Sequence, residues 1–165
     1  QQDPLFPFTK LLKPLKISSA TWQRDNKGVY LGSSFFYATL RDYAKLGYLF
    51  LQKGIWNNKK IFEPQWLNDS LNSFGLQFKN QPKSLEHPAA HLWLNRTKNN
   101  LKNPKKKWLN IPDDAFYASG HWGQIILIIP SLKMTITRLA SDKTKKFNLN
   151  KLFLLLKNNL LYLKS

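Results

Sequence analysis

A chain of 165 residues with 42% hydrophobic and 14% aromatic residues can bury a core, which excludes a disordered segment and fits one globular domain. The 26 Lys and Arg outnumber the 9 Asp and Glu, and the formal charge of +17 favours anionic partners such as nucleic acid, membrane headgroups or acidic glycans. Cysteine is absent, which excludes disulfides and thiolate metal sites. The sequence contains no run of about 18 apolar residues, the length that a transmembrane helix needs.

The N-terminal part of the chain, residues 1–73, is predicted to be mainly helical. A short helix around residues 9–13 is expected to stop at Pro14, because proline cannot continue a helix. Residues 21–36 are rich in Gly and Ser, and they predict a loop with at most a short extended piece.

The clearest helix is predicted to begin after Thr39. Thr39 can cap it, and Asp42 follows three residues later, close to a capping box. Gly54 is expected at the left-handed position after the last turn. Apolar residues at helical spacing predict the buried face: Leu40, Tyr43, Ala44, Gly47, Phe50 and Leu51. A tight turn centred on residues 57–58 and a second helix starting at Pro64 are expected next.

Residues 74–141 are predicted to form strands, with a basic loop inserted at 97–107. Short strands are expected in "FGLQFKN" and "HLWLNRT", on either side of a proline-containing loop. The segments "AFYAS", "QIILIIP" and "KMTITRLA" are joined by short turns and predict an antiparallel meander. The middle segment is apolar on both faces, so both of its faces are expected to be covered.

The last segment, residues 142–165, is predicted to contain a helix. One apolar face is expected to pack on the sheet: Leu149, Leu152, Phe153, Leu156 and Leu160. A helix lying on a membrane surface is the alternative interpretation. Helices, a meander and a terminal helix define an α+β fold, so residues 1–165 are expected to form a single domain.

The sequence lacks the usual nucleophile motifs. No Ser has Lys three positions later, and no Gly-x-Ser-x-Gly is present. His87 and His91 are four residues apart, but Pro88 lies between them and no third ligand is evident, so no metal site is predicted. The turn "SGHWG" at residues 119–123 could aim backbone N–H groups at an oxyanion, although composition and spacing alone favour a plain hairpin corner.

Four stretches of the chain resemble one enzyme family. "YATLRDYAKLGYLFLQKGIWNNKKIFEPQWL" resembles the stretch after the tyrosine motif in serine hydrolases of the β-lactamase and penicillin-binding type, in the branch of the 6-aminohexanoate-dimer hydrolases and related esterases. "LKPLKISSATWQRDNKGVYLGSS", "HLWLNR" and "PDDAFYASGHWGQIILIIPSLKMTITRLAS" are similar to flanking segments, in consistent order from about Leu11 to Ser141. The resemblance implies an antiparallel sheet flanked by helices, and acyl transfer through a serine.

By this resemblance, Ala118-Ser119-Gly120 occupies the family's third motif, Lys-Thr-Gly or a variant. Ser119, Gly120 and His121 are then the oxyanion side of the site, with the backbone N–H of His121 as a donor. Ala118 replaces the usual lysine, which fits esterase or amidase members better than penicillin-binding ones. The implied substrate pocket consists of Trp122, Gly123, Ser33 and Ser34.

The family's other two motifs, Ser-x-x-Lys and Tyr-x-Asn, are absent from this chain. We therefore expect only the C-terminal part of the fold of a bacterial hydrolase, which acts on an amide or ester bond once an upstream segment supplies the nucleophile and is inactive alone. No cofactor, metal, nucleic-acid partner or stable membrane span is implied. The compartment stays open between periplasm and cytoplasm, with any export signal expected upstream. The alternatives are a non-catalytic remnant or interaction module, and a basic protein that binds anions or nucleic acid.

Overall fold

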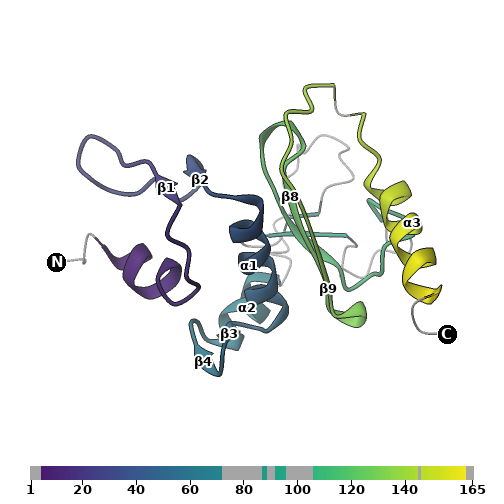
Figure 1. The fold of residues 1–165 in the computed structure, drawn as a ribbon, viewed down its shortest axis with the longest axis horizontal. Helices are drawn as coiled ribbons and strands as arrows, with labels where there is room; N and C mark the ends of the chain where they lie inside the picture. Colours follow the sequence, from purple (N-terminus) through teal and green to yellow (C-terminus); the bar gives the residue numbers. More distant parts are fainter. Residues whose placement is uncertain (1–4, 72–86, 89–91, 96–105, 145, 163–165) are drawn as a thin grey trace, which may run out of the picture.

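The computed structural model describes residues 5–71, 87–88, 92–95, 106–144 and 146–162. They form an α+β fold built around a five-stranded antiparallel sheet. Helices α1 and α2 lie on one side of the sheet and α3 lies on the other, while the short N-terminal elements sit beyond α1 (Figure 1). The α+β class predicted from the order of elements is confirmed.

The N-terminal part begins with η1 (Phe8–Leu12), a single π-helical turn that ends before Pro14, close to the predicted position. Two short strands follow, β1 (Thr21–Trp22) and β2 (Phe36–Tyr37), and they pair antiparallel. The sequence predicted a loop with at most one short extended piece here, whereas the structure has two short strands that pair across the loop.

Helix α1 (Leu40–Leu51) begins where its capping residue predicts. The Thr39 hydroxyl accepts a hydrogen bond from the Asp42 backbone N–H at 3.2 Å and donates one to the Asp42 carboxylate at 2.7 Å, which confirms the cap. At the other end, Lys53 and Gly54 both take positive φ, at 52° and 90°. The Gly54 N–H bonds the Leu49 carbonyl at 2.9 Å, as in a Schellman motif. Gly54 is therefore the second residue beyond the cap, Gln52, and the first position beyond the cap, which was predicted for Gly54, is taken by Lys53.

The buried face of α1 differs from the predicted stripe. Leu40 is 48% exposed, whereas Leu49, which lies outside the stripe, is only 1% exposed. The reason is that α1 is covered on two sides. Its Phe50 packs toward the sheet, and its Leu49 packs with Leu12 of the N-terminal part. A helix between two layers does not have a single apolar stripe.

The next hairpin and helix agree with the sequence. Strands β3 (Ile55–Trp56) and β4 (Lys59–Lys60) are joined through Asn57 and Asn58, whose φ values of 46° and 62° are those of a two-residue turn with both central residues left-handed. Helix α2 (Pro64–Leu71) starts at its proline.

The main sheet has the order β5-β6-β7-β8-β9. Its strands are β5 (His87–Pro88), β6 (Trp93–Leu94), β7 (Phe116–Ser119), β8 (Ile125–Ile129) and β9 (Met134–Arg138). The last three form the predicted meander, and β6 confirms the strand expected in "HLWLNRT". The strand predicted in "FGLQFKN" and most of the basic loop at 97–107 lie outside the described residues.

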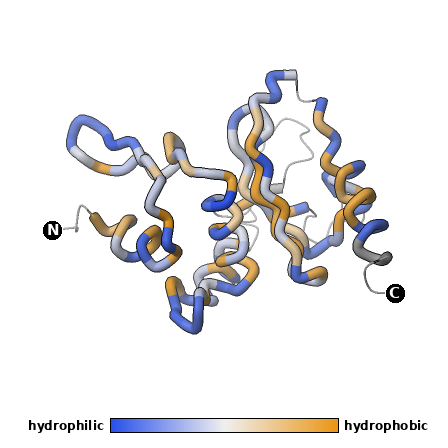
Figure 2. The backbone as a smooth tube through the Cα atoms, viewed as in Figure 1, coloured by the Kyte–Doolittle hydropathy of each residue, from blue (hydrophilic) through white to orange (hydrophobic). Residues whose placement is uncertain are grey.

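Strand β8 is covered on both faces, as its sequence predicts. Leu127 and Ile129 pack with Phe153 of α3 (Leu149–Tyr162), while Ile128 packs with Leu67 of α2. Hydrophobic residues follow the sheet and α3 in Figure 2. The predicted apolar face of α3 is confirmed for Leu149, Leu152, Phe153 and Leu156, and the Leu160 side chain lies outside the described residues. None of the helices in the described part is both long and apolar enough to cross a membrane.

Candidate active-site turn

Residues 119–123 form the corner between the two most buried strands of the sheet. Strand β7 ends at Ser119, which pairs with Ile125 of β8. The corner is closed by a hydrogen bond from the Gly120 N–H to the Gln124 carbonyl at 2.9 Å, and residues 121–123 make a short turn whose middle residue, Trp122, departs from helical dihedral angles. Ser119, Gly120, His121 and Trp122 are all exposed, so the corner meets solvent while its two strands are buried.

The turn contains two consecutive left-handed residues, Trp122 at φ 56° and Gly123 at φ 81°. Such a conformation is unfavourable for a residue with a Cβ, by roughly 1–2 kcal/mol. At position 123 a Cβ would also lie 2.5 Å from the Arg138 Nη1 atom. Position 123 therefore requires glycine for two reasons, and Trp122 stays left-handed because its surroundings hold it there.

Two charged residues hold the turn from the side of β9. Arg138, the last residue of β9, donates from Nη1 to the Gly123 carbonyl at 2.6 Å. The backbone N–H of Asp142 donates to the Trp122 carbonyl at 2.9 Å. Arg138 and Asp142 also form an ion pair at 3.5 Å between Nη2 and Oδ2. The carbonyls of both left-handed residues are thus bound by one bracket, which we call the Arg138–Asp142 bracket.

The bracket is itself fixed by its neighbours. The Asp142 carboxylate accepts hydrogen bonds from the Phe147 N–H at 3.1 Å and the Thr144 hydroxyl at 3.0 Å. These hydrogen bonds, foremost the one from Phe147, lower the pKa of Asp142, and the Arg138 charge adds to the effect. The Arg138 guanidinium lies 3.9 Å from the centre of the Phe147 ring. Asp142 is consequently ionised at neutral pH and keeps Arg138 directed at the turn.

The outer surface of the turn combines a backbone donor with aromatic rings. The hydrogen bonds that close and hold the turn come from the N–H groups of Gly120 and Asp142 and from the Arg138 side chain, and none of these bonds uses the His121 N–H. The rings of His121 and Trp122 lie 4.7 Å apart between centroids, and the Lys143 ammonium lies 4.7 Å from the Trp122 ring. An N–H beside an exposed, 41% accessible tryptophan can donate to a carbonyl oxygen while the ring contacts the attached group.

The structure does not bring all the predicted pocket residues together. Trp122 and Gly123 belong to the turn, but Ser33 and Ser34 are exposed residues of the loop between β1 and β2. That loop lies on the opposite side of α1 from the sheet (Figure 1). A common pocket of these four residues stays a prediction.

Within the described ranges, no group of three His, Asp or Glu residues is arranged to hold a metal ion. His91 lies outside these ranges. The residues that hold the candidate turn and that sequence analysis missed are Arg138 and Asp142. A spacing of four residues indicates an ion pair when both residues lie on one helix. Here Arg138 is the last residue of β9 and Asp142 lies in the segment that follows, so the spacing gave no signal.

No family model and no curated protein matches the chain. Its fold, however, occurs among solved structures. The chain is similar to a structure named "Putative 6-aminohexanoate-dimer hydrolase from Bacillus anthracis", with a TM-score of 0.65 and 21% sequence identity over 93% of this chain. The match covers 36% of that chain, so this protein spans about a third of its length. At this identity the likeness establishes a shared fold, which agrees with the fold expected from the sequence resemblance.

Proposed function

We propose that the chain is the C-terminal part of a serine hydrolase that cleaves an amide or ester bond through an acyl-enzyme. The turn at residues 119–123 forms one wall of its active site. The shared fold with a part of a longer hydrolase supports this proposal. The observation that carries the proposal is the Arg138–Asp142 bracket, which fixes the exposed turn from outside. A plain hairpin corner would be held only by the hydrogen bonds within the turn.

In acyl transfer, the serine oxygen attacks the carbonyl carbon, and the carbonyl oxygen becomes an oxyanion in the tetrahedral intermediate. The His121 N–H donates to this oxygen, and a second donor comes from the segment that carries the serine. The bracket contributes because donors fixed before the reaction need no reorganisation as the charge develops. Trp122 contacts the acyl group beside the reacting bond.

The first experiment is to determine the intact mass and N-terminus of the native polypeptide in its source cells. A longer product with Ser-x-x-Lys and Tyr-x-Asn upstream supports the hydrolase. A native product that starts near Gln1 contradicts it and favours the alternative, a non-catalytic remnant or interaction module.

The second experiment tests the donor in that longer product. His121→Pro removes this N–H at a position that lies outside the left-handed region, as proline requires. His121→Ala keeps the N–H and removes only the ring. Hydrolysis of a p-nitrophenyl ester is expected to lose roughly 10²–10³ in kcat with proline and to change little with alanine. Equal losses in both variants would assign the effect to the imidazole and contradict the proposed donor.

A further inference from the structure

The side of α3 that faces away from the sheet combines exposed leucines with an exposed lysine. The helix buries Leu149 and Phe153 against the sheet. Leu154 and Leu155 are 38% and 53% exposed on the other side (Figure 1). The stripe opposite the buried one, at helical spacing, is called the outer face of α3 and consists of four exposed residues: Lys151, Leu154, Leu155 and Asn158.

A neighbouring loop adds to this apolar surface. The Asn110 N–H donates to the Asn150 side-chain oxygen at 3.0 Å, which holds the loop against the first turns of α3. Leu109, the residue before Asn110, is 73% exposed, the largest value for a large hydrophobic residue in the described ranges. Asn150 and Leu154 are one helical turn apart on the same side of α3, so the loop places the backbone of Leu109 beside the outer face.

The helix presents its outer face without help from a ligand. Its first turn is capped by the Asn148 side-chain oxygen, which accepts a hydrogen bond from the Lys151 N–H at 3.0 Å. With 14 residues, α3 is about 21 Å long, shorter than the hydrocarbon core of a bilayer at about 30 Å. A helix of this length fits along a membrane surface.

The C-terminal part of the chain is strongly basic. After Asp142, the sequence contains six lysines and no acidic residue. Lys151 lies on the outer face and Lys157 lies at its border, and both are exposed. A helix with exposed leucines and lysines is complementary to a surface that is apolar below and anionic above.

The acidic residues of the segment under α3 are engaged elsewhere. Residues 111–115 pack against the inner side of the helix. Asp113 pairs with Lys106 at 2.6 Å. The Asp114 carboxylate accepts hydrogen bonds from the N–H and the hydroxyl of Ser131, at 2.6 and 2.9 Å. These carboxylates therefore stabilise their own loops and have charge or hydrogen-bond partners there.

The composition of the outer face favours a lipid surface over a protein partner. Protein interfaces are enriched in aromatic residues and arginine and depleted of lysine. The outer face contains only leucine, lysine and asparagine. At a membrane, the long apolar stem of lysine can lie along the acyl chains while its ammonium group reaches the lipid phosphates.

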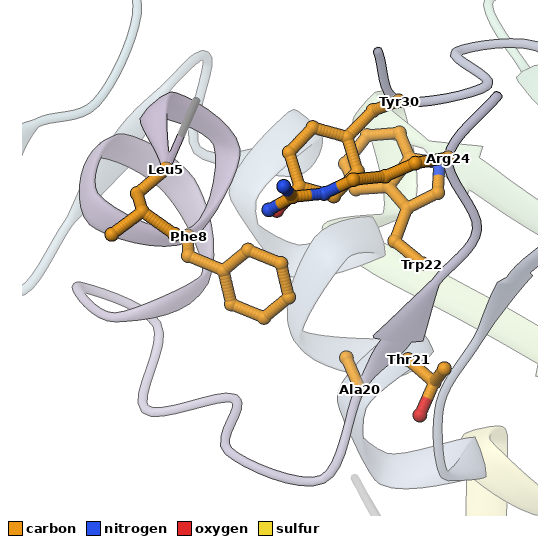
Figure 3. A pocket seen from close by; sticks show the side chains of 7 residues that line it. All are labelled: Leu5, Phe8, Ala20, Thr21, Trp22, Arg24 and Tyr30. Carbon is orange, nitrogen blue, oxygen red and sulfur yellow. The ribbon is translucent and has the colours of Figure 1, made fainter. Parts of the chain in front are cut away.

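The hollow beside η1 shows a different arrangement of apolar side chains. Its lining includes Phe8, Trp22 and Tyr30, and Figure 3 shows these rings gathered together. The Tyr30 ring lies 5.4 Å from Trp22 and 5.8 Å from Phe8 between centroids, so the rings already contact one another. These rings cover each other within the chain, whereas the leucines of the outer face of α3 meet solvent.

We propose that the outer face of α3 binds a membrane surface that contains anionic lipids. The helix lies along the bilayer, with Leu154 and Leu155 at the boundary between headgroups and acyl chains and with Lys151 and Lys157 at the lipid phosphates. The inner face of α3 keeps its predicted contact with the sheet. The proposal does not depend on the hydrolase function, because it uses no residue of the turn at 119–123.

The test is sedimentation of the full chain with lipid vesicles. One set of vesicles contains equal parts of phosphatidylglycerol and phosphatidylcholine, and the other contains phosphatidylcholine alone. We expect saturable binding to the anionic vesicles and an affinity at least about tenfold lower for the neutral ones, since each lysine near an anionic surface contributes about fivefold.

A pair of leucine variants tests the apolar contact. Leu155→Gln is expected to reduce the affinity for anionic vesicles about tenfold, because one leucine no longer enters the apolar boundary. Leu40→Gln makes the same change at a similarly exposed position of α1, and it is expected to reduce the affinity less than about twofold. Equal circular dichroism spectra show that both variants are folded.

A pair of double variants separates this contact from general attraction to a basic protein. Lys151→Gln with Lys157→Gln is expected to reduce the affinity for anionic vesicles about 20-fold. Lys27→Gln with Lys59→Gln removes the same charge at exposed positions of the N-terminal part. Lysines more than a Debye length from the membrane are screened, so this control is expected to lose less than about threefold.

A fluorophore shows which face meets the membrane. The chain has no cysteine, so one introduced cysteine can carry an NBD group. On Asn158→Cys we expect a blue shift and a gain in fluorescence with anionic vesicles. On Ser34→Cys, in the exposed loop between β1 and β2, we expect no change.

Four results would overturn the proposal. They are the absence of saturable binding to anionic vesicles, equal affinities for both kinds of vesicle, equal losses in the outer-face and control variants, and a blue shift at Ser34→Cys without one at Asn158→Cys. Self-association without vesicles that is lost in Leu155→Gln would assign the outer face to a second copy of the chain and also contradict the proposal.

Discussion

At the scale of single residues, the candidate turn depends on groups from three places in the chain. Gly123 supplies the left-handed backbone, and Arg138 and Asp142 bind the carbonyls that this backbone presents. Each hydrogen bond contributes modestly, by about 1 kcal/mol, but together they select one conformation of an exposed loop. The shape of the turn is therefore a property of this set of residues, and a change in one of them affects the others.

Replacing Gly123 tests this dependence. Gly123→Ala introduces strain at φ 81° and places a Cβ 2.5 Å from Arg138 Nη1, so we expect a loss of about 2 kcal/mol in the free energy of unfolding, measured with urea. Gly32→Ala is the control, because no atom lies within 4 Å of a Cβ there. If both variants are equally stable, the contact of Arg138 with the turn does not contribute to the free energy of unfolding.

Asp42 makes stability depend on pH. Hydrogen bonds from Lys45, then from Ser19 and Thr39, lower the pKa of this carboxyl from 3.8 to about 2. A depressed pKa in the folded state means that the ionised form stabilises the fold above pH 3.8 and that this contribution is lost as the pH falls toward 2.

We expect acidification from pH 6 to pH 2 to remove about 1–2 kcal/mol of stability through Asp42. In Asp42→Asn this component of the loss should be absent. The measurement is the free energy of unfolding in urea across this pH range. Asp69→Asn, which removes an exposed carboxyl on α2, should retain the acid loss due to Asp42. Identical pH profiles for the unaltered chain and Asp42→Asn would contradict the assignment.

At the scale of elements, α1 joins the two parts of the molecule. It lies against β8 and β9 on one side, and its Leu49 belongs to the N-terminal core on the other. The close approach to the sheet is made at Gly47, where a Cβ would be 2.9 Å from Ile126 Cγ2. A helix interior normally disfavours glycine by about 1 kcal/mol, so this position exchanges helix propensity for tight packing on the sheet.

Enlarging position 47 should separate α1 from the sheet. We expect Gly47→Leu to cost about 1–3 kcal/mol by overpacking, despite the better helix propensity of leucine. Arg41→Leu, at an exposed position of the same helix, should stay within about 0.5 kcal/mol of the unaltered chain. Thermal unfolding followed by circular dichroism compares the two. If Gly47→Leu were more stable than the unaltered chain, there would be room for a side chain between α1 and the sheet, which would contradict the close contact expected at Ile126.

At the scale of the whole molecule, the sheet needs a cover on both faces. α1 and α2 cover one face, and α3 covers the other through Leu149 and Phe153, which are 5% and 1% exposed. Without α3, the side chains of Tyr117, Leu127 and Ile136 would meet water as one contiguous patch.

A charge on the inner face of α3 tests this role. Phe153→Asp should undock the helix, because an unpaired buried carboxylate is strongly unfavourable. We expect higher binding of the dye ANS and association in sedimentation. Leu155→Asp makes a closely similar change at a residue of α3 that is 53% exposed, and it should leave both signals unchanged. Equal behaviour of the two variants would mean that α3 is not required to cover the sheet.

The elements with strong local signals could be predicted from the sequence. Thr39 with Asp42, the Asn57-Asn58 pair and Pro64 each determine a helix start or a turn through interactions within a few residues. The apolar run of β8 indicated a strand that is covered on both faces, because a strand with apolar side chains on both faces can bury them only between two layers. Fold class and the position of the candidate turn followed from these signals.

Tertiary structure alone decided the rest. The exposure of Leu40 and the burial of Leu49 depend on α1 having neighbours on two sides, which helical periodicity cannot indicate. The separation of Ser33 and Ser34 from the turn depends on where α1 lies between them (Figure 1). Arg138 reaches Gly123 because β8 and β9 pair antiparallel, which brings the end of β9 beside the start of β8. By itself, the sequence determined the elements, since short-range interactions set them, while contacts between residues distant in the chain arise only when the sheet and its helices assemble.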